Sequence, residues 1–126
     1  MSAIFDAGAF IALEKGDQLM ERRFKGARQS AIPLKTHGGV VAQVWRGGTG
    51  GQTRLARALQ SVEAVPLDAE LGRRAGVLLA RCGESDAIDA ALVAMADHGD
   101  EIITSDPEDL IVLVAASRRR INIIPI

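Results

Sequence analysis

The sequence predicts a single-domain α/β protein in which a parallel sheet of about five strands is covered by helices on both faces. Two observations lead to this prediction. Short runs of strand character alternate five times with segments whose apolar residues recur at helical spacing. The chain of 126 residues, 48% of them hydrophobic, is long enough for one core and too short for two, so residues 1–126 are expected to form one domain.

The first half of the chain is expected to supply three of the strands. Ser2–Phe5 is apolar and ends at Asp6, and small residues then lead into a helix that closes near Gly16. The elements predicted next are a helix at 17–28, a strand at 31–34, a helix capped by Thr36 that runs through Trp45, a helix at 52–60 and a strand at 62–67. The segment Gly47–Gly51 is interpreted as a loop, because it lacks the ending of a phosphate-binding loop.

The second half is expected to supply the other two strands. Asp68 caps a helix that reaches about Cys82, and Ser85 caps another that runs to His98. A β-branched strand at 101–104 follows, and Ser105-Asp106-Pro107 begins a helix because proline suits a first helical turn. Residues 121–126 form the last predicted strand.

Charge is strongly segregated along the chain, although the net charge is only −1. The segment 83–117 contains nine carboxylates and no lysine or arginine, so all 15 basic residues lie outside it. A folded chain keeps so many acids close together only when counter-charge is near, and a bound divalent cation would provide it. The balanced total excludes a strongly basic protein that binds nucleic acid through its net charge alone.

Acidic residues occupy the positions where an α/β sheet builds its sites. Asp6 and Asp106 each follow a predicted strand, and Asp86 and Asp89 lie three residues apart at the start of a helix. Asp6 can also be explained as a simple helix cap. Carboxylate oxygens without histidine or cysteine partners favour Mg²⁺ or Mn²⁺ over zinc, and such an ion suits phosphodiester hydrolysis.

Other reactive residues give weaker signals. Cys82 is the only cysteine, which excludes an intramolecular disulfide and is consistent with a reducing cytosol. His37 and His98 are isolated and fit no catalytic triad, and Trp45 is interpreted as a core or subunit-contact residue. No signal peptide or apolar stretch of about 20 residues is recognisable, so a soluble cytoplasmic protein is expected.

The motifs IFDAGAFIALE and DAIDAALVAMADHGDEIITSDPEDL, with the strand and helix spacing between them, resemble PIN-domain ribonucleases and in particular their VapC-like toxins. The resemblance spans nearly the whole chain. It implies a PIN-like α/β/α sandwich in which Asp6, Asp89 and Asp106 hold the metal and Asp86 is an auxiliary acid. It further implies an RNA substrate, a homodimer and a small antitoxin partner that blocks the acidic site.

One position departs from the family pattern. The family usually has a glutamate on the helix after the second strand, and this chain places Gln43 there. An amide oxygen can coordinate or orient water but carries no charge, so metal affinity is expected to be weaker unless Asp86 compensates.

Two other functions therefore stay open besides a metal-dependent endoribonuclease toxin. One is a catalytically weakened PIN-like domain that mainly binds protein or RNA, as Gln43 suggests. The other is a receiver-like or phosphatase-like domain that uses Asp6 as phosphoacceptor. It is disfavoured because no second aspartate lies two residues after Asp6 and no lysine follows the late strand.

Overall fold

The computed structural model describes residues 1–126, and its strands and helices alternate as the sequence predicts. In chain order the elements are β1 (Ala3–Phe5), α1 (Ala7–Glu14), α2 (Gln18–Gln29), β2 (Leu34–His37), α3 (Gly38–Val44), the 3-10 helix η1 (Gly50–Gln52), α4 (Thr53–Leu59), β3 (Glu63–Val65), α5 (Ala69–Cys82), α6 (Ala87–Met95), β4 (Glu101–Thr104), α7 (Pro107–Ser117) and β5 (Asn122–Pro125).

The five strands form one parallel sheet in the order β3-β2-β1-β4-β5. The chain moves outward from β1 through β2 to β3, and then returns to the other side of β1 to add β4 and β5. The strand order therefore reverses between β1 and β4. Such a reversal opens a crevice at the carboxyl ends of the two strands, where open α/β sheets bind their ligands.

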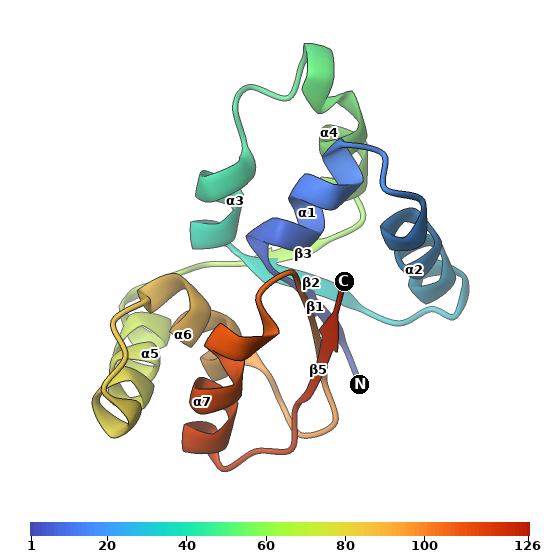
Figure 1. Ribbon diagram of the computed structural model, residues 1–126. Coiled ribbons are helices and arrows are strands. Elements are labelled where there is room, and N and C mark those ends of the chain that lie inside the picture. Colours follow the sequence, from blue (N-terminus) through green and yellow to red (C-terminus); the bar gives the residue numbers. More distant parts are fainter.

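Helices cover the sheet in two groups (Figure 1). Helix α1 packs against α2, α3 and α4, whereas α5, α6 and α7 all pack against one another. Figure 1 shows the two groups on opposite sides of the sheet, which confirms the predicted three-layer arrangement. None of the helices has the length and apolar character needed to cross a bilayer.

The core is centred on β1, whose three residues are all buried. A central strand covered on both faces needs apolar side chains on both sides, which explains the uninterrupted run Ala-Ile-Phe. The ring of Phe5 lies 5.8 Å from Phe10 in α1 and 5.7 Å from Phe24 in α2, measured between centroids. These contacts fix the first two helices on one face of the strand that leads to Asp6.

Several local predictions were wrong, among them the end of α6, which lies at Met95 and not at His98. The second strand is Leu34–His37 rather than 31–34, and the cap of α3 is therefore His37, not Thr36. The cap of α6 is Asp86, one residue beyond the predicted Ser85. Trp45 is 39% exposed and is not a core residue, because its ring folds over Gly48, where a Cβ atom would lie 2.2 Å from it. A subunit contact at Trp45 stays a prediction.

Candidate active site

Asp6 is the buried acid of the site, with 6% of its surface exposed. It follows β1 and caps α1, because its Oδ1 accepts a hydrogen bond of 2.8 Å from the backbone N–H of Ala9. Its Oδ2 accepts a second hydrogen bond from the hydroxyl of Thr104. Burial raises the pKa of Asp6 despite these hydrogen bonds, which lower it. The interpretation of Asp6 as a helix cap is therefore correct, and the same carboxyl group still faces the strand ends.

Thr104 joins the ends of β1 and β4. Its hydroxyl donates to Asp6 and accepts a 2.9 Å hydrogen bond from the backbone N–H of Asp106. Asp106 stands at the cap position of α7, but its side chain accepts no hydrogen bond from that helix. The carboxylate of Asp106 is exposed and stays available to a ligand. Sequence reasoning missed Thr104, because a threonine at the end of a strand is usually no more than a strand residue.

The start of α1 lies very close to the segment that follows β4. A Cβ atom on Gly8 would lie 1.8 Å from the hydroxyl oxygen of Ser105, so only glycine permits this approach. The first turn of α1 and the segment after β4 are thus in contact next to Asp6 and Asp106 in the chain.

Helix α6 brings the remaining acids to the same edge. Asp86 accepts hydrogen bonds of 3.0 Å from the backbone N–H groups of Ile88 and Asp89 and so caps the start of α6. Burial, together with the negative charges of Asp86, Asp6, Asp109 and Asp106 in that order, raises the pKa of Asp89 to about 6. The charges of the other three predicted acids thus act on Asp89, and so does that of Asp109, which sequence reasoning did not single out.

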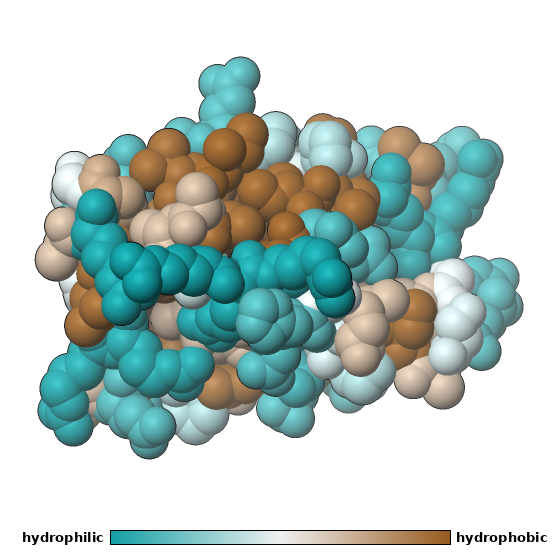
Figure 2. Space-filling view, turned by 90° about the horizontal axis from the view of Figure 1, so that it is seen from below, coloured by the Kyte–Doolittle hydropathy of each residue, from teal (hydrophilic) through white to brown (hydrophobic).

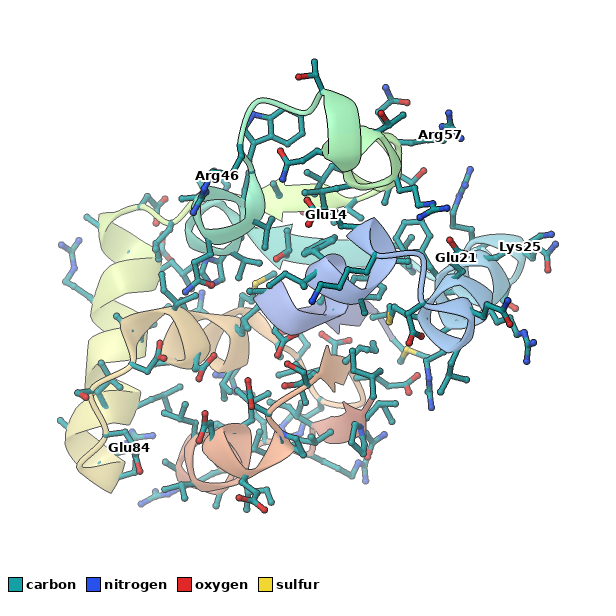
Figure 3. All side chains as sticks on the ribbon, turned by 45° about the horizontal axis from the view of Figure 1, so that its top comes forward. Glu14, Glu21, Lys25, Arg46, Arg57 and Glu84 are labelled. Atoms are coloured by element: carbon teal, nitrogen blue, oxygen red, sulfur yellow. The ribbon has the colours of Figure 1, made fainter.

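No cation of the chain neutralises this acidic edge. The one salt bridge in the structure joins Arg54 to Glu21, 4.0 Å apart, on helices outside the site. Figure 3 shows Lys25 and Arg57 extending outward from α2 and α4, and Glu84 at the far end of α5, away from the centre of the molecule. None of the acids of this edge is therefore paired with a positive side chain in a salt bridge.

A hard cation fits the donor chemistry and the charge of the edge. The donors are carboxylate oxygens, which suit Mg²⁺ or Mn²⁺. No three of the chain's His, Cys, Asp and Glu side chains are close enough in the structure to hold one ion together. Mg²⁺ does not require such a cage, since it keeps several of its waters and is commonly held by one or two carboxylates. The residues therefore fit an ion bound largely through water.

Two other polar residues lie at the same sheet edge without joining the acids. His37 ends β2 and is fully buried, and its Nδ1 accepts a hydrogen bond from the backbone N–H of Gly39, so its Nε2 carries the proton donated to the carbonyl oxygen of Ile88. Burial lowers the pKa of His37. Gln43 is exposed on α3 and its side chain makes no hydrogen bond. Gln43 was predicted to turn toward the acids, but its side chain makes no hydrogen bond to any of them.

No protein-family model matches the sequence, and no curated protein is significantly similar to it. The fold does match solved structures. One of them is a chain in the crystal structure of VapBC2 from Rickettsia felis bound to a DNA fragment from their promoter, with a TM-score of 0.64 and 13% sequence identity over 98% of both chains. At this identity the likeness concerns the fold, and it confirms the predicted PIN-like α/β/α sandwich.

Proposed function

We propose that this protein is a Mg²⁺- or Mn²⁺-dependent endoribonuclease that acts as the toxin of a type II toxin–antitoxin pair. One observation carries the proposal: the ends of β1, β4 and α6 gather Asp6, Asp89 and Asp106 at the switch point of the sheet with no cation of the chain beside them. The likeness of the fold to a chain of VapBC2 supports the toxin–antitoxin part.

Each acid has a definite part in this proposal. Asp6 and Asp89, the more buried carboxylates, hold the ion, and the exposed Asp106 orients a water of its shell or a phosphate oxygen. Asp86 is an auxiliary acid that increases the negative potential. When bound, the ion supplies positive charge for a phosphoryl oxygen and lowers the pKa of a water molecule. Thr104 is a positioning residue, since its hydroxyl fixes the carboxyl group of Asp6 against the backbone of Asp106.

The proposal also includes partners that the resemblance implies. The substrate is RNA, the chain forms a homodimer in the cytoplasm, and a small antitoxin covers the acidic edge. A groove of about 560 Å³ between α1, α2 and the C-terminal Ile126 is suited to that partner. It is lined by Ile11 and Leu19 and reaches Gly8 and Ser105, so an apolar segment lying in it would extend over the entrance to the site.

The proposal is tested by incubating purified protein with a panel of structured RNAs in Mg²⁺, in Mn²⁺ and in chelator. Cleavage is expected only with metal and is expected to be lost in Asp6→Asn and Asp106→Asn. Calorimetric titration should show weak binding of Mg²⁺ or Mn²⁺ without selectivity for zinc, because the ligands are hard oxygens. Tight Zn²⁺ binding that survives both substitutions would disprove the assignment of the site.

A second candidate is a PIN-like domain that mainly binds protein or RNA. The absence of a closed group of metal ligands and the neutral Gln43 favour it. The same assay separates the two functions. RNA binding or antitoxin binding by the parent protein, without cleavage in either metal, would establish the binding function.

A further inference from the structure

A second group of charges lies between α2 and α4, in a pocket of about 240 Å³. Arg28 of α2 and Arg54 and Arg57 of α4 line this pocket, and Glu21 is its only acid. The apolar part of its wall comes from buried side chains of α1, α2 and α4. The pocket, called the basic pocket below, therefore has three exposed positive side chains against one negative side chain.

Arg54 is held in place within the basic pocket. Its Nε lies 4.0 Å from Oε1 of Glu21, and a Cβ atom on Gly16 would lie 2.5 Å from its Nη1. The guanidinium group thus lies against the backbone at the end of α1. The salt bridge joins two exposed side chains that water screens, so it neutralises Arg54 only weakly. A guanidinium group that is already in position loses less entropy when it binds an anion.

The basic pocket and the acidic edge lie at opposite ends of α1. Asp6 caps the first turn of this helix, and Leu13, which lines the pocket, belongs to its last turn. At a rise of about 1.5 Å per residue, these two residues are about 10 Å apart along the helix axis. An extended polymer of phosphates can therefore reach both sites.

The acidic edge alone would repel RNA, because both carry negative charge, so RNA must find positive charge elsewhere on the molecule. Figure 2 shows the molecule from below, the end away from α4 in Figure 1, where an apolar area is bordered by hydrophilic side chains. An apolar surface gives a phosphate no hydrogen bonds in place of those it makes with water. The basic pocket, at the α4 end, is the better position for an RNA strand.

We propose that the basic pocket binds a backbone phosphate of the RNA other than the phosphate that is cleaved. The proposal rests on the RNA substrate proposed above, but it does not depend on a metal ion or on cleavage. Guanidinium groups suit this ligand, because their fixed fork of N–H donors matches the oxygens of a phosphate. RNA is favoured over an acidic segment of a protein, since phosphates repeated along one strand can occupy the pocket and the acidic edge together.

The first test measures the binding of a fluorescein-labelled single-stranded RNA by anisotropy in chelator, where no metal-dependent cleavage occurs. The double variant Arg28→Gln/Arg57→Gln should raise the Kd by about tenfold, because charged hydrogen bonds to the phosphate are lost. Arg73→Gln is the matched control, since Arg73 is exposed on α5, on the opposite face of the sheet, and should bind RNA like the parent. A parent that binds no RNA, or a folded double variant that binds it equally well, would overturn the proposal.

The salt dependence tests whether the arginines share one phosphate. Each phosphate contact on a single strand contributes about 0.7 to the slope of log affinity against log salt concentration. Replacing all three arginines by glutamine should therefore reduce the magnitude of this slope by about 0.7 in total. A reduction of about 2, the value for three separate phosphate contacts, would show independent surface charges instead of one pocket.

Glu21→Gln should have the opposite effect and lower the Kd for RNA a few-fold, because it removes the only acid of the pocket. Figure 3 shows Glu21 and Arg57 on the same side of the molecule and Glu84 on the other side, so Glu84→Gln is the control. Equal effects of the two substitutions would mean that only the net charge matters, and the pocket would lose its assignment.

Cleavage kinetics separate this proposal from the proposed function. In a parent that cleaves RNA, the double variant should raise KM and leave kcat unchanged, because the pocket holds the ground state and the transition state alike. An unchanged KM would overturn the pocket and leave the ribonuclease in place, whereas a parent that binds RNA through the pocket without cleaving it would do the reverse. Loss of polyglutamate binding by the double variant, with RNA binding intact, would assign the pocket to an acidic protein segment and overturn the proposal.

Discussion

The two ends of α6 both carry charged groups, but their surroundings differ. At the C-terminal end, Arg74 and Arg119 donate hydrogen bonds to the carbonyl oxygen of Ala94, and Arg119 also donates to that of Ala96. At the N-terminal end, Asp86 and Asp89 supply negative charge. Both arrangements suit the helix dipole, which favours acids at the start of a helix and bases at its end.

Only the C-terminal end is completed by the chain itself. There, positive side chains meet carbonyl groups that the helix leaves without partners. At the N-terminal end, the acids of α6 have further carboxylates as neighbours instead of positive side chains. These negative charges raise the pKa of Asp89. The difference teaches that the hydrogen bonds at one end of α6 favour stability, whereas the repulsion among acids at the other end opposes it, as we expect of the metal site proposed above. Four substitutions test this division.

The largest expected effect follows from Asp89→Asn at the N-terminal end. Loss of one negative charge should lower the rate of metal-dependent RNA cleavage by about a hundredfold or more, the scale of a lost electrostatic stabilisation. The same change relieves repulsion among the acids, so the variant should melt at the same temperature as the parent or higher in chelator. RNA cleavage and thermal melts provide the two measurements.

Asp97→Asn is the matched control, because Asp97 is an exposed acid just beyond the C-terminal end of α6. It should cleave RNA like the parent. If Asp89→Asn does so as well while folding normally, the division between the two ends is incorrect.

The second effect concerns the C-terminal end. Arg119→Gln removes charged donors from two backbone carbonyl groups, and the free energy of unfolding should fall by about 2 kcal/mol. Metal binding at the other end should not change. Chemical denaturation measures the first quantity and calorimetry the second.

Arg120→Gln serves as the control, because Arg120 makes hydrogen bonds through its backbone alone: its N–H donates to Nδ1 of His98 and its carbonyl oxygen accepts from the N–H of Gly99. Equal stability of the Arg119 and Arg120 variants would show that the contacts at Ala94 and Ala96 contribute little.

A third effect is a dependence on pH through His37, which holds the first turn of α6 by its hydrogen bond to Ile88. Burial lowers the pKa of His37 from 6.5, so the unfolded chain takes up this proton at a higher pH than the folded chain does. The contribution of His37 to stability is complete above pH 6.5 and is lost as the pH falls toward the pKa of the folded state.

The measurement compares melts of the parent and of His37→Gln between about pH 5 and 7.5, across the range in which histidine titrates. Asp89 is present in both proteins, so its own titration cancels in the difference. The stability advantage of the parent should shrink as the pH is lowered. A difference that does not vary with pH would mean that His37 is not held neutral.

The smallest expected effect is that of Gln43→Glu. An added carboxylate should tighten Mn²⁺ binding by a few-fold only, because position 43 is exposed and its charge is screened by water. Titration calorimetry measures the change, with Gln29→Glu on the exposed side of α2 as the control. Equal affinities in the two variants would show that Gln43 does not face the metal.

The parts of the site that could be predicted are those encoded by neighbouring residues. Asp6 and Asp106 directly follow short apolar strands, and the parallel order brings both strand ends to one edge. The register of β2 could not be predicted in this way. Its residues Thr36 and His37 are polar, and they are buried because they bond to Phe5 and Ile88, which lie 31 and 51 residues away.

The role of Thr104 in the site could not be predicted either, because it also depends on a residue far away in the chain. Its role depends on Asp6, which lies 98 residues away and is brought near only by the pairing of β1 with β4. Asp109 looked like an ordinary acid of a first helical turn, where the dipole favours it. Only the packing of α6 beside α7 gives it an influence on Asp89.

The position of β1 in the sheet has a consequence for how the chain folds. The first of the five strands along the chain lies in the middle of the sheet, and its residue Ala3 pairs with Glu101, which is synthesised almost a hundred residues later. Until then, one edge of β1 stays open while its apolar side chains lack half of their cover. Contacts so distant in sequence slow folding and prolong exposure of such surfaces. A nascent chain that stops before Thr104 therefore contains Asp6 and Asp89 but no assembled site.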